Sequence, residues 1–169
     1  MSFLRDRSLG NKGEELVQKI FQGHGFKTEL NSDRSKFADF DIKALFKEQE
    51  LLLEAKYDLY CARSGNIAIE FFNPKQGKAS GIGSTKSDLW AHVITDPLSV
   101  WLAPVSCLRQ YTSTTKPHKL VSCGGDDNSS MYLYKKDVIF GAIFTRVDEC
   151  GKDDFIKTIS ELLERGKLC

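Results

Sequence analysis

Acidic residues and one lysine lie close together in two neighbouring apolar runs of this chain. Asp39 and Asp41 begin the first run, and Glu54 and Lys56 end the second run, 51–56. Side chains alternate between the two faces of a strand, so Glu54 and Lys56 are expected on the same face. An antiparallel pairing of the two runs would bring Asp41 to the same edge of the sheet.

Two carboxylates and one ammonium group around a single point are suited to phosphodiester hydrolysis. Carboxylate oxygens bind hard divalent cations such as Mg²⁺ or Mn²⁺. A bound cation polarises a phosphate and lowers the pKa of a bound water, and a nearby lysine favours an anion. The sequence therefore predicts a metal-dependent hydrolytic site at the end of the strand that carries Glu54 and Lys56.

The motif formed by Asp41 and Glu54-Ala55-Lys56, with Gly13-Glu14 on an earlier predicted helix, resembles the PD-(D/E)XK nuclease superfamily. The resemblance covers about residues 10–95 and includes the order of helix, strand, strand and further strand. No proline precedes Asp39 or Asp41, so the first half of the motif is incomplete and the choice of aspartate stays open.

This resemblance implies an α/β restriction-endonuclease-like core, in which a central mixed β-sheet is flanked by α-helices. The chain is then a single domain over residues 1–169, with a core at about 9–104 and a C-terminal elaboration at 105–169. It further implies a metal-dependent endodeoxyribonuclease, structure- or site-specific, of the Holliday-junction resolvase-like, restriction or homing type. Its partner would be double-stranded or branched DNA, and a homodimer would place two sites on two strands.

Five residues receive roles from the resemblance. Asp41 and Glu54, with the backbone carbonyl of Ala55, would hold Mg²⁺ or Mn²⁺, and Glu14 would complete the shell or bind a second ion. Lys56 would orient the attacking water and offset negative charge in the transition state. Two alternatives remain: a non-catalytic nucleic-acid-binding or assembly protein on the same fold, and an α/β protein in which Glu54 and Lys56 are only a surface charge pair.

A helix is predicted over residues 9–25, because Leu16, Val17, Ile20 and Phe21 fall on one stripe at helical spacing. Glu14 lies at the edge of this stripe, and small residues at Gly10 and Gly13 would let the helix approach the sheet. Alternatively, Glu14 is only a first-turn acid favoured by the helix dipole.

A glycine-rich basic loop over residues 73–86 is predicted to contact the phosphates of a nucleic acid. Its candidate contacts share charge or hydrogen-bonding capacity and are Lys75, Lys78, Ser84, Thr85 and Lys86. Ser84 is the expected N-cap of a helix that continues to residue 92, and Lys86 is a candidate for an additional active-site residue.

The run 66–72 before this loop is predicted as another strand of the same sheet. Glu70 within it is either a solvent-facing residue on a half-exposed sheet or an acid that supports the metal site. Further along, the pattern predicts strands over 100–103 and 131–134 and helices over 105–111 and 153–163. His92 is expected to be a partly buried structural residue.

Composition limits the function less than the motifs do. The chain has 169 residues with a net charge of +1, so its overall charge does not support binding to nucleic acid. It contains no apolar run of membrane-spanning length and no secretory signal, which predicts a cytoplasmic protein without a membrane partner. Its five cysteines are widely spaced and form no CxxC pair, so reduced thiols are expected.

Overall fold

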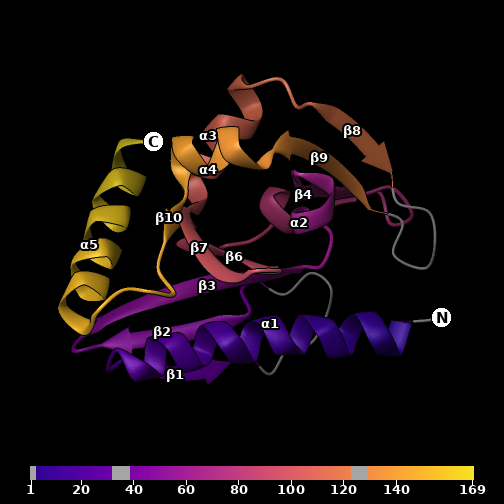
Figure 1. Ribbon diagram of the computed structural model, residues 1–169. Helices are drawn as coiled ribbons and strands as arrows, with labels where there is room; N and C mark the ends of the chain where they lie inside the picture. Colours follow the sequence, from indigo (N-terminus) through magenta and orange to yellow (C-terminus); the bar gives the residue numbers. More distant parts are fainter. Residues whose placement is uncertain (1–2, 32–38, 123–128) are drawn as a thin grey trace.

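The computed structural model describes residues 3–31, 39–122 and 129–169, which form two β-sheets and the helices around them (Figure 1). The larger sheet, sheet A, has six strands in the order β1-β2-β3-β6-β7-β10. These strands are β1 (Lys27–Leu30), β2 (Ile42–Phe46), β3 (Gln49–Asp58), β6 (Leu89–Thr95), β7 (Leu98–Pro104) and β10 (Thr145–Arg146). β3 and β6 run parallel and the other neighbouring pairs run antiparallel, which confirms the predicted mixed sheet.

The smaller sheet, sheet B, is antiparallel and has the order β5-β4-β9-β8. Its strands are β4 (Asn66–Asn73), β5 (Lys78–Ala79), β8 (Lys119–Ser122) and β9 (Ser130–Lys135). The prediction of a strand over 66–72 is confirmed, but its placement in the same sheet as β3 is wrong. β4 follows β3 through a short helix and pairs with β9 from the second half of the chain.

Helices cover both faces of sheet A (Figure 1). They are α1 (Phe3–Gly23), α2 (Cys61–Ser64), the 3₁₀ turn η1 (Gly81–Gly83), α3 (Val105–Thr114), α4 (Lys136–Ile143) and α5 (Lys152–Leu168). The helices predicted over 9–25, 105–111 and 153–163 are therefore present, and the first begins earlier than expected. Among the described helices, none is long and apolar enough to cross a membrane.

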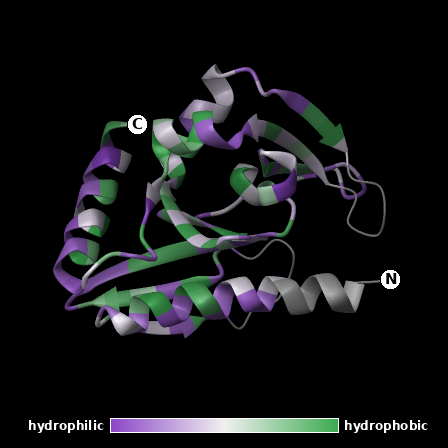
Figure 2. Cartoon of the chain, viewed as in Figure 1, coloured by the Kyte–Doolittle hydropathy of each residue, from purple (hydrophilic) through white to green (hydrophobic). Residues whose placement is uncertain are grey.

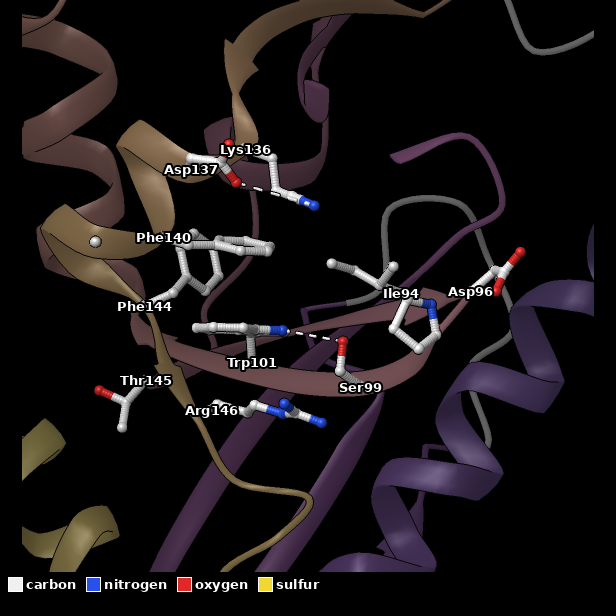
Figure 3. A pocket seen from close by; sticks show the side chains of 12 residues that line it. Ile94, Asp96, Ser99, Trp101, Lys136, Asp137, Phe140, Phe144, Thr145 and Arg146 are labelled. Carbon is white, nitrogen blue, oxygen red and sulfur yellow. Dashed lines mark hydrogen bonds and ion pairs between the residues drawn. The ribbon is translucent and has the colours of Figure 1, made fainter. Parts of the chain in front are cut away.

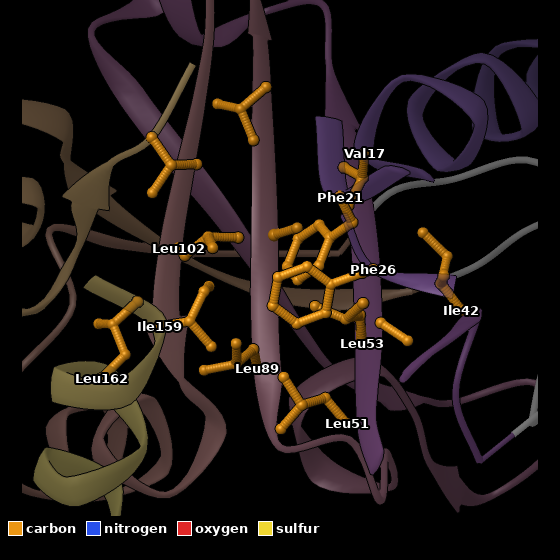
Figure 4. Close-up of a cluster of buried hydrophobic side chains, with 14 of the residues drawn as sticks. Val17, Phe21, Phe26, Ile42, Leu51, Leu53, Leu89, Leu102, Ile159 and Leu162 are labelled. Atoms are coloured by element: carbon orange, nitrogen blue, oxygen red, sulfur yellow. The ribbon is translucent and has the colours of Figure 1, made fainter. Parts of the chain in front are cut away.

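One face of sheet A packs against α1 and α5 in a purely apolar layer (Figure 4). Leu51 and Leu53 of β3 point into this layer, where Phe21 meets Phe155 of α5 edge to face at 5.1 Å. Each fully buried side chain of this size stabilises the fold by about 1.5–3 kcal/mol. Both helices carry hydrophilic and hydrophobic residues, as is expected for helices that pack one face on this layer and expose the other (Figure 2).

Gly13 sets the distance between α1 and β3. A Cβ atom at this position would lie 2.9 Å from the Cβ of Tyr57, so a larger residue would push the helix away. The expectation of a close approach is confirmed at Gly13, but Gly10 is exposed and has no neighbouring atom within 4 Å of an added Cβ. α1 ends at Gly23, and Gly25 has a φ of 93°, a left-handed conformation that favours glycine.

The helix predicted to follow Ser84 is wrong, because this segment leads into the central strand β6. Every residue from Leu89 to Ile94 is buried, since β6 lies between β3 and β7 and both faces of the sheet are covered. A strand that is buried on both faces has no apolar-polar alternation, and a short apolar run of this kind is compatible with either structure. The pairing partners of β6 decide its conformation.

Cys107 of α3 and Cys169 after α5 form a disulfide, with their Cα atoms 5.0 Å apart. The expectation of reduced thiols is therefore wrong for these two residues, which are 62 positions apart in the sequence. Cys61 is free and buried, Cys150 is free and half-buried, and Cys123 lies outside the described residues.

Candidate active site

The charged residues of β3 lie on the face of sheet A opposite its apolar layer. Leu51 and Leu53 point toward α1 and α5, so the alternating residues Glu54 and Lys56 point toward sheet B. The shared face predicted for Glu54 and Lys56 follows from this alternation.

Asp41 joins them from the neighbouring strand. The register pairs Ile42 with Leu53, which places Asp41 beside Glu54. The backbone N–H of Asp41 donates to the carbonyl of Leu53 at 2.9 Å, and its Oδ2 accepts from the N–H of Ala55 at 2.7 Å. The Asp41 carboxylate is thus fixed to the backbone of the strand that carries Glu54.

Burial and neighbouring charge make Glu54 a weak acid. Desolvation raises its pKa, and the negative charge of Asp41 raises it further, to about 8 from an ordinary value of 4.5. A hydrogen bond from the Thr85 side chain and the charge of Lys56 act in the opposite direction and are outweighed. The pair of carboxylates therefore binds a proton at neutral pH unless another cation replaces it.

Lys56 is held as an ammonium group by the surrounding carboxylates. Its Nζ lies 3.4 Å from Oε2 of Glu70, and its side chain is 36% exposed. Desolvation acts to lower the pKa of Lys56, but the negative charges of Glu70, Glu54 and Asp41 outweigh it and the pKa is raised. Lys56 is therefore positively charged beside the two carboxylates.

Glu70 belongs to this cluster, although its role was left open by the sequence. The residue is only 7% exposed, so the alternative of a solvent-facing position is wrong. Its Oε1 accepts a hydrogen bond from Ser129 Oγ at 2.9 Å, while Oε2 faces Lys56. In the sequence, Glu70 stood out as an acid inside the apolar run 66–72. Its burial and its contact with Lys56 favour the alternative in which it supports the metal site.

Two glycines of η1 allow the loop after sheet B to lie against Glu70. Gly81 has a φ of 51°, and a Cβ there would lie 2.5 Å from the carbonyl oxygen of Glu70. A Cβ on Gly83 would lie 2.5 Å from the carbonyl oxygen of Phe71. Because η1 packs this closely on β4, Thr85, which lies two residues after η1, is directed into the site.

Thr85 was predicted to contact nucleic acid, but it is only 2% exposed. Its hydroxyl hydrogen-bonds the carboxyl of Glu54 and lies 3.2 Å from the backbone oxygen of Asp39. Thr85 is therefore part of the buried shell that supports Glu54, and a direct surface contact with a phosphate chain is excluded by its burial.

The other predicted loop residues are closer to the surface. Lys75 and Lys78 are exposed at the turn between β4 and β5, and Ser84 is half-buried directly after η1. Lys86 is exposed and forms an ion pair with Asp39 at 2.8 Å. This pairing holds Asp39 at the rim, which favours Asp41 as the aspartate that acts with Glu54.

Glu14 lies on the helix that packs against the other face of sheet A. Gly13, its neighbour, contacts Tyr57, which packs against the apolar layer between sheet A and α1. The groups that shift the pKa of Glu54 are Asp41, Thr85, Lys56 and Glu70. A metal-binding role for Glu14 stays a prediction.

The carboxylates present suit a cation that keeps most of its water ligands. Among the described residues, no group of three or more histidine, cysteine, aspartate or glutamate side chains is arranged to hold a metal ion. Mg²⁺ needs only one or two protein carboxylates, because water and substrate phosphate supply its other ligands. Asp41 and Glu54, whose mutual repulsion raises the pKa of Glu54, fit that requirement.

A pair formed by His92 and Asp58 follows on the same face of sheet A. His92 Nε2 lies 3.1 Å from Oδ2 of Asp58, and His92 is fully buried. Burial would raise the pKa of Asp58, but hydrogen bonds and charge from His92, with the N–H groups of Tyr60 and Cys61, lower it. Since Trp90 Nε1 donates to His92 Nδ1 at 3.4 Å, His92 is fully engaged, and its predicted structural role agrees with these contacts.

A shallow cavity of about 630 Å³ lies elsewhere, between the β6–β7 turn and α4 (Figure 3). Trp101 stacks on Phe140 at 4.5 Å along its wall, and Lys136 and Arg146 lie at its edge. Arg146 is engaged by Asp148 at 3.0 Å. Neither Glu54 nor Lys56 lines this cavity, so it is separate from the candidate active site.

Comparison of the chain with protein-family models, with curated proteins and with solved structures finds no match. The candidate function must therefore be argued from the cluster around Glu54.

Proposed function

We propose that this protein is a metal-dependent endodeoxyribonuclease that hydrolyses phosphodiester bonds at the cluster of Asp41, Glu54 and Lys56. The observation that carries the proposal is the convergence of two carboxylates and one ammonium group on one face of β3. This is the residue set that the PD-(D/E)XK resemblance requires, and the high pKa of Glu54 indicates a site short of positive charge.

Each side chain has a defined task in this proposal. Asp41 and Glu54, with the carbonyl of Ala55, would hold Mg²⁺ or Mn²⁺, which supplies polarisation of the phosphate and a water of lowered pKa. Lys56 remains protonated and places its ammonium group against the negative charge that develops on the phosphate oxygens. Glu70 holds the Lys56 Nζ in place, and Thr85 orients the Glu54 carboxyl.

The architecture supports a restriction-endonuclease-like core in this proposal. A helix, two antiparallel strands that carry the acidic residues and a further strand parallel to β3 follow in the order that the resemblance implies. Sheet B is an addition whose strands β4 and β5 lie between β3 and β6 in the chain, and whose strands β8 and β9 follow β7. A cytoplasmic location and a homodimer that cuts two strands belong to the same proposal.

Cleavage assays test the proposal directly. Supercoiled plasmid, linear duplex, single-stranded DNA and a four-way junction would be incubated with wild type and with Glu54→Gln, in Mg²⁺, Mn²⁺ or EDTA. Cutting that needs the metal and disappears in Glu54→Gln supports the nuclease, and the preferred substrate distinguishes resolvase-like from site-specific types. A folded protein that binds DNA in EDTA but cuts none of these substrates would favour the non-catalytic binding protein instead.

A further inference from the structure

Charge is divided unequally between the two layers of the molecule. The segments 59–87 and 105–135, which form sheet B with α2 and α3, contain eight lysines and arginines and three acidic residues, a net charge of +5. The rest of the chain contains 16 lysines and arginines and 20 acidic residues, a net charge of −4. The overall charge of +1 therefore conceals a basic layer next to an acidic one.

The basic residues of this layer lie at the surface. All eight are exposed, and they are Arg63, Lys75, Lys78, Lys86, Arg109, Lys116, Lys119 and Lys135. Of its three acids, Glu70 is buried against Lys56, and Asp126 and Asp127 lie outside the described residues. Lys119 and Lys135 form no ion pair with another described residue.

The register of sheet B connects two of these lysines with the candidate active site. Lys119 lies opposite Leu133, Lys135 is two residues further along β9, and Glu70 lies opposite Met131. Because alternate residues of a strand share a face, Lys119, Lys135 and Glu70 all belong to one face of sheet B. Glu70 contacts Lys56 from that face, so the face leads from the two lysines to the cluster around Glu54.

We propose that this face of sheet B, marked by Lys119 and Lys135, binds the phosphate backbone of the nucleic acid and leads it to the Glu54 cluster. This inference rests on the proposed function, since it identifies where the substrate of that site lies. Along β9, Lys135 is four residues from Met131, the residue paired with Glu70, and this separation corresponds to about 13 Å.

Binding measured without catalysis tests this surface. The affinity of wild type for a fluorescent 20-base-pair duplex would be followed by anisotropy in EDTA, from about 50 to 200 mM salt. The variant carries Lys119→Glu and Lys135→Glu. Its matched control carries Lys12→Glu and Lys19→Glu, which are exposed residues of α1 on the other side of sheet A. Circular dichroism would verify that both variants are folded.

We expect the sheet B variant to bind DNA at least about tenfold more weakly than wild type. The slope of log affinity against log salt should become shallower by about two, because two phosphate contacts are removed. The α1 control should bind like wild type. Equal losses in both variants, or wild-type binding by the sheet B variant, would overturn the proposal. If wild type binds phosphatidylserine vesicles but no DNA, and the sheet B variant loses the vesicle binding, this face binds a membrane surface and the proposal is wrong.

The two proposals fail separately in this design. If metal-dependent cutting persists and the sheet B variant cuts and binds like wild type, the nuclease stands and the binding surface is wrong. If wild type neither binds nor cuts any DNA, the proposed function itself is wrong.

Discussion

The two faces of β3 show how one strand can serve stability and chemistry separately. On one face, Leu51 and Leu53 are buried in the apolar layer with α1 and α5. On the other face, Glu54 and Lys56 are half-buried beside Asp41 and Glu70, and desolvation together with the charge of Asp41 raises the pKa of Glu54 to about 8. Burial of an ionisable group without full compensation costs stability, so the charged face is retained for a reason other than folding. This contrast is what leads us to assign function to the charged face.

The largest expected effect is on the charged face. Glu54→Gln keeps the shape of the side chain but removes a metal ligand, so cleavage should fall by a factor on the order of 10³ or more. The free energy of unfolding near neutral pH should rise, because Glu54 with a pKa of about 8 must take up a proton on folding and glutamine need not. Cleavage kinetics and urea denaturation of the same preparation would measure both quantities. Unchanged cleavage would remove Glu54 from the site.

Leu53→Ala should produce the opposite result on the apolar face. Leu53 is fully buried, and its truncation leaves a cavity that should lower the free energy of unfolding by about 2–5 kcal/mol. Cleavage by the protein that remains folded should stay close to wild type when it is measured well below the unfolding midpoint. A variant that is stable but inactive would show that the two faces are not independent.

Glu70→Gln should have a smaller effect, since Glu70 acts through Lys56. Without the negative charge at 3.4 Å, the Lys56 ammonium group is less well positioned, and kcat should fall by about tenfold to a hundredfold. KM and the affinity for Mg²⁺, measured by calorimetry, should stay near their wild-type values. Glu70→Asp should recover part of kcat, because it restores the charge. A change in metal affinity alone would instead identify Glu70 as a ligand.

Glu54 should also give the protein a pH dependence of stability. Glu54 has a pKa of about 8 in the folded protein and near 4.5 when unfolded, so the folded state binds more protons between these values. The free energy of unfolding should therefore fall as pH rises from about 4.5 to about 8, and Glu54→Gln should remove this part of the slope. Denaturation at pH 5, 6.5 and 8 in EDTA would measure it. If the free energy of unfolding changes equally with pH in wild type and Glu54→Gln, Glu54 is not protonated in the folded protein.

Added Mg²⁺ should reverse this trend in wild type. A cation that replaces the proton of Glu54 stabilises the folded state, and its affinity should increase as pH rises toward 8 because the proton leaves more easily. The same titration of Glu54→Gln serves as the control. Equal stabilisation of both proteins by Mg²⁺ would place its binding elsewhere.

The sequence by itself determined the local elements that carry the motif. Strand alternation placed Glu54 and Lys56 on one face, the apolar stripe of 16–21 indicated α1, and the spacing of Asp41 indicated an adjacent antiparallel strand. These features depend on residues that are neighbours in the chain or one turn apart, where periodicity is informative.

Only the tertiary structure decided the surroundings of the motif. Glu70 and Thr85 reach Lys56 and Glu54 because β4 belongs to sheet B and η1 packs on β4 through Gly81. β6 is a strand because β3 and β7 flank it, and Cys107 meets Cys169 because α3 and α5 pack together. Each of these outcomes depends on pairing between distant segments, and local propensity and hydrophobic period contain no information about such partners.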